Sequence, residues 1–253
     1  MAPADAPVTF DRLTDLELDE PPTFIEGLPG HGLVAAIAID QITTQLGLAH
    51  HGNIVSEHIP PIASFDDGRI RDPVRVYAGP PGVMTLQSDM PLPERAFEAL
   101  GTCVLEELAP EFELAIFLAG APAQSKEELG EVRGVATSDA VEARLRDADI
   151  ELADGTGLIG GVTGALVSAC DHADVPAAVL IVQANPYVPD PAAARAVIED
   201  ALEPLVDFDI DTTELEVEAD QIQQQLQRIA SQYQEMSERS PTSDRPPGPS
   251  MYQ

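Results

Sequence analysis

The sequence predicts an α/β domain in which a mainly parallel β-sheet is flanked by helices and extended by antiparallel hairpins. Strand-like segments alternate with segments of helical periodicity over residues 20–205, which is typical of strands joined by crossover helices. Two continuous apolar runs, at residues 114–118 and 177–182, have the composition of strands buried on both faces. Between residues 60 and 88, turn signals separate short apolar runs, which predicts the antiparallel pairs.

The first half of the chain begins with a predicted strand at residues 22–27 and a glycine-rich loop from Gly27 to Gly32. A helix is expected at residues 33–46, because its apolar residues recur at helical spacing. The turn signal Asp66-Asp67-Gly68 predicts a hairpin that returns through Val74–Tyr77. The other elements expected here are strands at residues 53–59, 62–65 and 83–88 and a turn at residues 79–82.

The second half opens with Pro93, which lies where a helix would begin, and apolar spacing continues that helix through residue 108. A glycine-rich stretch, Gly155 to Gly164, precedes a helix that runs through about Cys170. The remaining expected elements are strands at residues 114–118, 150–152 and 177–182 and helices at residues 139–147 and 191–205.

No internal repeat and no linker precede residue 206, so we expect one domain. Two overlapping capping-box patterns, beginning at Asp211 and Thr213, predict the start of a C-terminal helix. Apolar residues in this helix alternate by four and three from Leu215 to Met236, which is a heptad seam. The predicted organisation is an N-terminal segment at 1–19, an α/β domain at 20–210, the helix at 211–239 and a disordered tail at 240–253.

The heptad seam covers three heptads, which is marginal for a free coiled coil. We therefore expect the seam to pack either on the domain or on a sister subunit. The pattern alone leaves both alternatives open.

The charge of the chain is strongly negative, with 44 acidic and 13 basic residues and a net charge of −31. The acidic residues are spread along the whole chain, and Lys126 is the one lysine. Molar salt shortens the Debye length to about 3 Å and screens such repulsion, so the composition favours a halophilic, salt-loaded cytoplasm. An acidic surface argues against nucleic acid and against anionic membranes as partners. No long apolar run or signal-peptide pattern is present, so we expect a cytoplasmic protein.

Catalytic and metal patterns are weak. Ser168, Asp171 and His172 are near one another in sequence, but no nucleophile elbow surrounds the serine. The histidines have no metal-ligand spacing, and Asp147 to Glu151 is followed by Leu152 where a calcium loop requires glycine. The two cysteines lie among apolar neighbours in predicted helices and are expected to be buried and free. We therefore expect no catalytic residue, no metal and no cofactor.

Two glycine-rich segments keep a nucleotide or phosphate site open as an alternative. Gly155-Thr-Gly157-Leu-Ile-Gly160 matches the dinucleotide-binding pattern, but the next predicted strand ends at Gln183-Ala-Asn185 without the acid that holds a ribose. The Gly27–Gly32 loop lies between a strand and a helix, where backbone N–H groups can hold an anion. Tight packing by small residues and a structural turn are the simpler interpretations.

The last residues form the most informative pattern. Residues 240–250 contain four prolines and no large apolar residue, which predicts a semi-extended spacer that spans roughly 34 Å. The chain then ends in Met251, Tyr252 and Gln253. A hydrophobic residue, a tyrosine and a free carboxylate at the end of such a spacer are typical of a compact docking element.

Several segments are informative when they are taken together and in order along the chain. They are Gly27-Leu-Pro-Gly-His-Gly-Leu-Val-Ala35, Ile59-Pro-Pro61, Asp67-Gly68, Pro73-Val-Arg-Val-Tyr77, Gly160-Gly-Val-Thr-Gly-Ala-Leu166, Pro176-Ala-Ala-Val-Leu-Ile181 and Phe208-Asp-Ile-Asp-Thr-Thr-Glu-Leu215. Together they resemble the proteasome assembly chaperone 2 family, in its archaeal, haloarchaeal-type form. The resemblance covers about residues 20–240. It implies an α/β sandwich related to nucleoside phosphorylases but without their catalytic residues, assembled into homo-oligomers.

The same resemblance implies a function for the tail, because some members of that family end in a hydrophobic residue, a tyrosine and any residue. Met251, Tyr252 and Gln253 match this pattern position by position. The resemblance implies a non-enzymatic, ATP-independent chaperone or cap whose tail inserts between α-subunits of the 20S proteasome. Tyr252 would then order the pocket, the Gln253 carboxylate would pair with a pocket lysine, and Met251 would fill an apolar contact.

Overall fold

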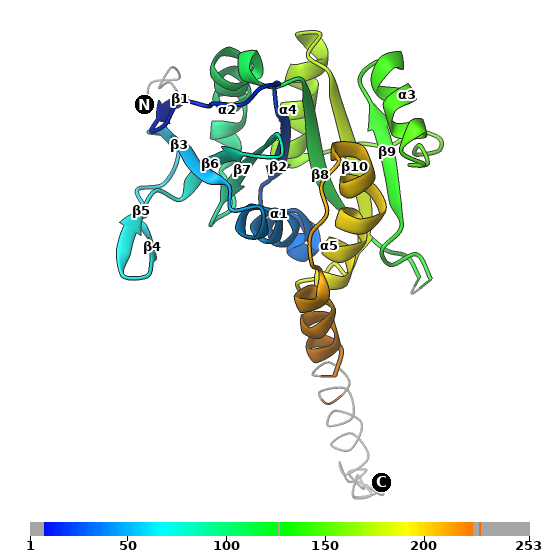
Figure 1. Cartoon of the computed structure of the whole chain (residues 1–253). Helices are drawn as coiled ribbons and strands as arrows, with labels where there is room; N and C mark the ends of the chain where they lie inside the picture. The colour runs from blue at the N-terminus through cyan, green and yellow to red at the C-terminus, as the bar shows by residue number, and fades with distance from the viewer. Residues whose placement is uncertain (1–7, 126, 225–227, 229–253) are drawn as a thin grey trace, which may run out of the picture.

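The computed structural model describes residues 8–125, 127–224 and 228, and these form one three-layer α/β/α domain (Figure 1). Among these residues, eight strands make one sheet in the order β1-β3-β6-β7-β2-β8-β10-β9, and β4 and β5 make a separate hairpin. The strands are β1 (Val8–Arg12), β2 (Thr23–Gly27), β3 (Ala49–Ser56), β4 (Ser64–Asp66), β5 (Arg69–Arg71), β6 (Val74–Gly79), β7 (Val83–Ser88), β8 (Leu114–Pro122), β9 (Val132–Ala136) and β10 (Ala177–Ala184).

The helices cover both faces of this sheet. Helix α1 packs on α5 over one face, and α2 packs on α4 over the other. Short 3-10 and π-helical segments extend α2 through Glu111 and join α5 to α6. The α-helices are α1 (Val34–Gln45), α2 (Phe97–Cys103), α3 (Asp139–Asp147), α4 (Gly161–His172), α5 (Pro191–Val197) and α6 (Glu203–Val206).

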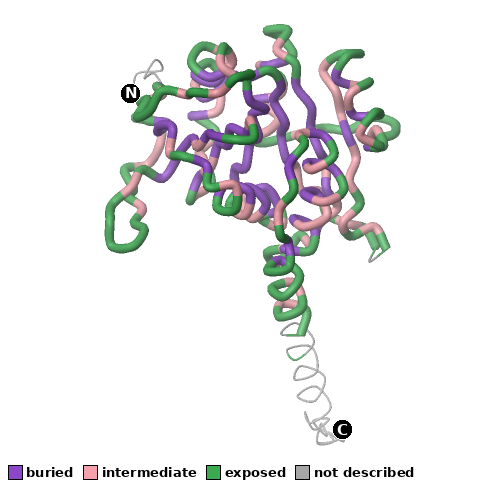
Figure 2. Tube along the Cα trace, in the orientation of Figure 1, coloured by how far each residue is buried: buried purple, intermediate pink, exposed green. Residues whose placement is uncertain are grey.

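The four central strands β7, β2, β8 and β10 are parallel to one another, and antiparallel strands extend the sheet on both sides. Strand β8 is buried along its first five residues, as a strand covered on both faces must be. Side chains alternate across it, so Ile116 joins the core under α1 and α5 and Phe117 joins the core under α2 and α4. Figure 2 shows the resulting buried band through the centre of the molecule.

The predicted α/β fold, with a parallel centre, flanking helices and antiparallel pairs, is confirmed. The predicted bounds of the strand at 83–88 and of the helix at 139–147 match β7 and α3. The Ser138 hydroxyl accepts a hydrogen bond of 3.3 Å from the Val141 amide and thereby caps α3. Asp190 caps α5 in the same way, through the amide of Ala193 at 3.1 Å.

The hairpin prediction was wrong about the returning strand. Asp67 and Gly68 do form the turn, both with positive φ, but the chain returns through β5. The segment Val74–Gly79 instead joins the main sheet as β6, because its alternate residues are needed in the core. The edge strands β1 and β9 were not predicted, since both are short and carry charged residues. The segment 150–152 contributes only one bridge, between Leu152 and Gly134.

Residues 213–224 form the described part of the C-terminal helix, which projects from the lower end of the domain in Figure 1. The Asp211 carboxylate accepts a hydrogen bond of 2.9 Å from the Thr213 amide, as a helix cap does. The Asp211 amide bonds to the Gln45 side chain at 2.9 Å, which ties the helix start to α1. No helix among the described residues is long and apolar enough to cross a membrane.

Candidate functional site

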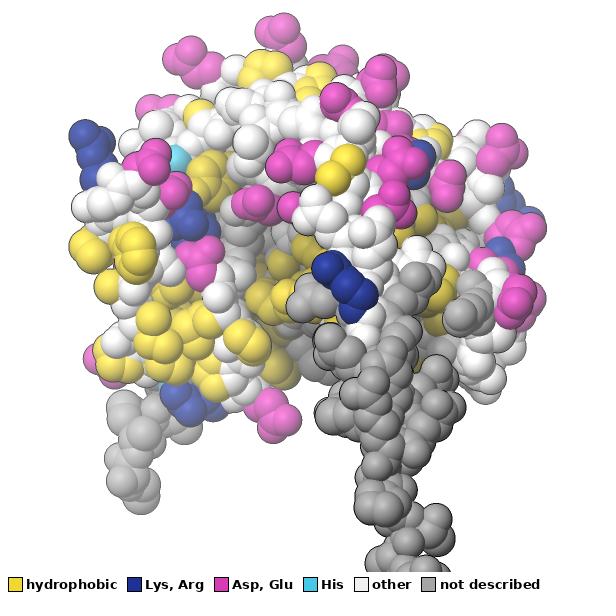
Figure 3. Space-filling view, turned by 90° about the horizontal axis from the view of Figure 1, so that it is seen from below, with side chains coloured by type: hydrophobic (Ala, Val, Ile, Leu, Met, Phe, Trp, Pro, Cys, Tyr) yellow, Lys and Arg dark blue, Asp and Glu magenta, His cyan; other side chains and the backbone are white. Residues whose placement is uncertain are grey.

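The carboxyl ends of β2, β7, β8 and β10 lie at one end of the domain, which is where ligands bind in open parallel α/β sheets. Figure 3 views this end of the molecule, from which the C-terminal helix projects, and shows hydrophobic side chains gathered on it. The loops here expose Leu33, Leu129, Leu158 and Tyr187, with 40%, 44%, 102% and 91% of their surfaces accessible. Exposed apolar residues clustered on one end favour a protein contact there.

The Gly27–Gly32 loop is shaped by packing against its neighbours. A methyl group on Gly27 would lie 2.5 Å from Ile39 of α1, and one on Gly120 of β8 would lie 2.3 Å from the His31 carbonyl oxygen. Gly32 has a φ of 62°, which favours glycine. Its carbonyl accepts a hydrogen bond of 2.8 Å from the Asp190 amide. The loop therefore has the properties of a structural turn.

The Gly155–Gly164 segment does not have the context of a dinucleotide site. The residues before it form a single bridge and no strand, whereas the pattern requires a strand that leads into the turn. Methyl groups on Gly155, Gly157 and Gly160 would meet open space, so tight helix–sheet packing does not explain these glycines either. Only Gly164 is close to another group, because a methyl group there would lie 2.2 Å from the Ile159 carbonyl oxygen.

The side chain of Glu26 accepts hydrogen bonds from both glycine-rich segments. Its side chain is fully buried at the end of β2 and accepts a hydrogen bond of 2.7 Å from the Leu28 amide. Its second oxygen accepts one of 3.2 Å from the Thr163 hydroxyl, in the first turn of α4. Burial removes the carboxylate from water and raises the pKa of Glu26 to about 8. A protonated carboxyl group is therefore the main form below that pH.

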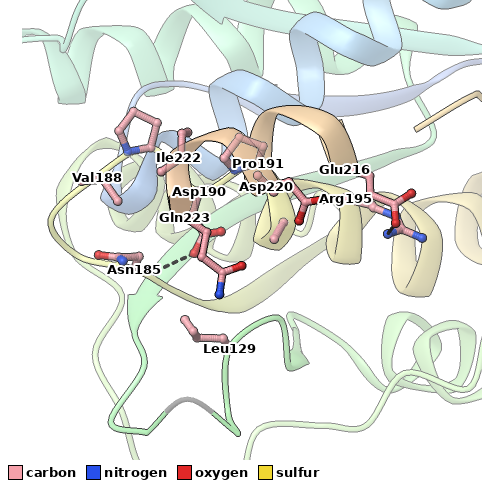
Figure 4. Close-up of a pocket in the computed structure, with 13 residues that line it drawn as sticks. Leu129, Asn185, Val188, Asp190, Pro191, Arg195, Glu216, Asp220, Ile222 and Gln223 are labelled. Carbon is pink, nitrogen blue, oxygen red and sulfur yellow. Dashed lines mark hydrogen bonds and ion pairs between the residues drawn. The ribbon is translucent and has the colours of Figure 1, made fainter. Parts of the chain in front are cut away.

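A groove lies between the C-terminal helix and the start of α5 (Figure 4), and we name it the α5 groove. Its volume is about 640 Å³. Val188, Pro191 and Ile222 are among its apolar lining residues, and Glu216 and Asp220 contribute carboxylates from the helix. Ala219 and Ile222 belong to the predicted heptad seam, so this part of the seam faces the groove. Leu215, the first seam residue, is instead buried in the domain core.

The catalytic and metal candidates do not come together. Ser168, Asp171 and His172 are exposed on α4, and their side chains form no hydrogen bond with one another. No group of three or more metal-binding side chains exists among the described residues. Cys103 and Cys170 are buried and free, as predicted, and burial raises the pKa of their thiols to about 12 and about 11. Such thiols are poor nucleophiles near neutral pH.

The predicted docking residues Met251, Tyr252 and Gln253 lie outside the described residues, as does the spacer before them. The structure shows where the segment that carries them starts. The helix that precedes them leaves from the end of the domain that exposes apolar loops.

Comparison with known proteins shows the family. A family model described as the PAC2 family matches residues 24–230. The chain belongs to the PAC2 family. An uncharacterised protein of Methanocaldococcus jannaschii is 28% identical over 222 residues, which cover 87% of this chain and 90% of that protein.

Solved PAC2-type structures share the fold. Pyrococcus furiosus PbaA, described as an archaeal homolog of proteasome-assembly chaperone, is 28% identical with a TM-score of 0.79. The match covers 92% of this chain and 95% of that one. Pyrococcus furiosus PbaB, described as an archaeal proteasome activator, has a TM-score of 0.76 at 18% identity, over 88% of this chain and 99% of that one. At that identity the likeness shows the fold alone.

Sequence reasoning missed two features of this PAC2 domain. Glu26 is the one acidic residue in an otherwise uncharged strand, Thr23–Gly27, and that contrast was the available signal. For the α5 groove, only the heptad residues Ala219 and Ile222 gave a signal. The facing wall comes from residues 185–195 and Leu129, which no sequence pattern connects to the helix.

Proposed function

We propose that this chain is a non-enzymatic, ATP-independent proteasome assembly chaperone or cap that binds α-subunits of the 20S proteasome through Met251, Tyr252 and Gln253. Membership of the PAC2 family over residues 24–230 is the observation that carries the proposal. The likeness to PbaA, a homolog of proteasome-assembly chaperone, supports it over most of both chains.

The tail supplies the proposed contact. Met251 and Tyr252 bury apolar surface in a pocket between α-subunits, and the Gln253 carboxylate pairs with a lysine there. In a salt-rich cytoplasm the ion pair is screened at its rim, so the two side chains carry more of the affinity. In this proposal the chain acts as a homo-oligomer. Several tails on one assembly then gain affinity through effective concentration.

Binding of the full chain to archaeal 20S proteasome, and to free α-subunits, tests this proposal. The measurement is made in molar KCl with and without residues 251–253. Loss of binding on truncation supports docking through the tail. Equal binding by both forms moves recognition to the folded domain.

Absence of binding by both forms sinks the chaperone proposal. The alternative, a nucleotide- or phosphate-binding enzyme that uses the glycine-rich segments, is then tested by thermal stabilisation with nucleotides and phosphate. Truncation of residues 251–253 should leave that stabilisation unchanged, which separates the two functions.

A further inference from the structure

The C-terminal helix is attached to the domain through its first turn. Residues 213–224 form the described part of this helix, which at about 1.5 Å per residue is roughly 18 Å long (Figure 1). Leu215, in the first turn, has 3% of its surface exposed and lies in the core under α1 and α5. No residue from Glu216 to Gln224 is buried. The direction of the helix therefore depends on contacts made by the few residues at its start.

On one side of this start, the Gln45 side chain of α1 bonds to both backbone groups of Asp211. Its amide oxygen accepts a hydrogen bond of 2.9 Å from the Asp211 N–H, and its NH2 group donates one to the Asp211 carbonyl oxygen. The Gln41 side chain, one turn earlier in α1, donates a bond of 3.1 Å to the same carbonyl oxygen. Because the N–H and the C=O of Asp211 are both held, α1 fixes the residue that caps the helix.

On the other side, Glu199 lies in the π-helical segment Ile198–Leu202 that follows α5. Its carboxylate accepts a hydrogen bond from the hydroxyl group of the buried Thr212 and one of 2.8 Å from Arg195 Nε. These two bonds lower the pKa of Glu199, so it is charged near neutral pH. Arg195 Nη1 also lies 3.7 Å from the Glu216 carboxylate. Arg195 and Glu199 thus connect the α5 region to the helix and to the residue before it.

We name Gln41, Gln45, Arg195 and Glu199 the clamp. Its two sides come from α1 and the α5 region, and α1 and α5 pack on each other over the same face of the sheet. With Leu215 in the core, the start of the helix is held from three directions. A rotation of about 20° at this point would move the end of a helix of about 18 Å by roughly 6 Å. Contacts at the base therefore control where the following segment starts.

The charge of the helix makes such contacts necessary. Residues 213–224 contain no base and four acids, which are Glu214, Glu216, Glu218 and Asp220, and the whole chain has a net charge of −31. Like charges on the helix and on the domain repel each other. Arg195 is the one base among the described residues that line the α5 groove. The bonds from Gln41 and Gln45 join neutral groups, so salt does not screen them and the α1 side of the clamp also holds at high salt.

We propose that Gln45 and Glu199 are positioning residues for docking: through the clamp they fix the direction in which the C-terminal helix, and the segment that ends in Met251, Tyr252 and Gln253, leaves the domain. For the role of that segment, the proposal rests on the proposed function. Each of the two residues acts through the residue that it holds, Asp211 or Thr212. A tail that starts at a fixed place samples a smaller volume, which raises its effective concentration at its pocket.

Distance measurements between two spin labels test the clamp in the full chain. Labels on Gln224→Cys, at the end of the described helix, and on Glu98→Cys, exposed on α2, report the direction of the helix relative to the domain. Cys103 and Cys170 are buried thiols with raised pKa values, so they should stay unlabelled. An excess of unlabelled chains ensures that the distance is measured within one chain. An intact clamp should give one narrow distance distribution, and a broad one overturns the proposal.

Alanine substitutions on each side of the clamp have matched neighbours. Gln45→Ala and Glu199→Ala should each broaden the distribution by roughly 6 Å, the displacement that a rotation of about 20° produces. Thr44→Ala and Asp200→Ala change exposed neighbours of the two residues and should leave it unchanged. Glu199→Gln keeps an oxygen that accepts from Thr212, so it should remain close to the wild type. An unchanged distribution in either clamp variant, or equal broadening in its control, overturns the clamp.

Binding to 20S proteasome in molar KCl then connects the direction of the helix to docking. Gln45→Ala keeps Met251, Tyr252 and Gln253, so it should still bind, with an apparent affinity about tenfold lower than that of Thr44→Ala because its tail is less well placed. Equal affinities would overturn the positioning role. If no form of the chain bound proteasome while the distances responded as expected, the proposed function would fail and the clamp would stand. Circular dichroism confirms that each variant is folded.

Discussion

The hydroxyl group of Thr163, in the first turn of α4, donates a hydrogen bond of 3.2 Å to the buried carboxyl group of Glu26 at the end of β2. The other carboxyl oxygen of Glu26 accepts from the Leu28 amide. One acidic side chain thus connects the two glycine-rich segments at the end of the sheet where the chain exposes its apolar loops. Its environment makes the stability of the domain dependent on pH.

Replacement of Glu26 by glutamine should shift the difference in unfolding free energy between variant and wild type in favour of the variant as pH rises. The folded state raises the pKa of Glu26 from 4.5 to about 8, so the folded state holds a proton that the unfolded state has released between these values. The wild type therefore loses stability from pH 4.5 to 8, relative to Glu26→Gln, by at most about 1.4 kcal/mol per pH unit. Urea unfolding of both proteins from about pH 5.5 to about pH 9 measures this difference.

Thr163→Val is the matched partner of that experiment. The hydrogen bond from Thr163 lowers the pKa of Glu26, so its removal raises that pKa further. The pH window over which stability falls should then extend above its wild-type upper limit. Parallel curves for the wild type and Glu26→Gln at every pH would instead show that Glu26 titrates with an ordinary pKa.

The fold was predictable where its elements carry their own local signal. The continuous apolar run at Leu114–Leu118 predicts a buried central strand, and Ser138 and Asp190 are recognisable helix caps. Strands β1 and β9 were missed because edge strands are short, polar and stabilised by their neighbours. The returning strand β5 was missed because Arg69-Ile-Arg71 has too few apolar residues to show a period.

The candidate functional residues also differ in whether a sequence pattern can reveal them. Met251, Tyr252 and Gln253 are adjacent in sequence, so a pattern can reveal them without a structure. Glu26 and Thr163 are 137 residues apart, and only the fold brings them together. The α5 groove likewise depends on how the C-terminal helix lies against α5. Patterns in one sequence do not contain that information.

A methyl group added at Gly120 should destabilise the domain. The added group in Gly120→Ala would lie 2.3 Å from the His31 carbonyl oxygen, so the segment that contains His31 must move away from β8. Displacements of this kind typically cost about 1–3 kcal/mol of unfolding free energy. Gly30→Ala is the matched control, because a methyl group there meets nothing within 4 Å and the backbone is extended. Equal midpoints for the two variants in urea unfolding would contradict the close contact.

Asp89→Asn should destabilise the protein more than Asp66→Asn. Arg75 has only 2% of its side chain exposed, and removal of its anionic partner leaves a buried guanidinium without a counter-charge. Two charge-assisted hydrogen bonds are weakened, so a loss of about 2–3 kcal/mol is expected. Asp66 is 66% exposed and pairs with Arg71 at the surface, where such pairs contribute about 0–1 kcal/mol. Thermal and urea unfolding of both variants measure the difference. An equally large loss for Asp66→Asn would show that the surface pair within the β4–β5 hairpin contributes as much as the buried pair.

The two parts of the proposed docking element should respond differently to salt. Addition of one glycine after Gln253 moves the terminal carboxylate, so binding to 20S proteasome should fall more at about 0.1 M KCl than at about 2 M KCl, where the ion pair is screened. Tyr252→Ala removes buried apolar surface and should reduce affinity at least tenfold at both concentrations, because burial is not screened by salt. Ser250→Ala, one residue outside the motif, is the control. If Tyr252→Ala bound as tightly as Ser250→Ala at the higher salt concentration, burial of the tyrosine would not carry the affinity, and recognition would have to depend on another surface of the protein.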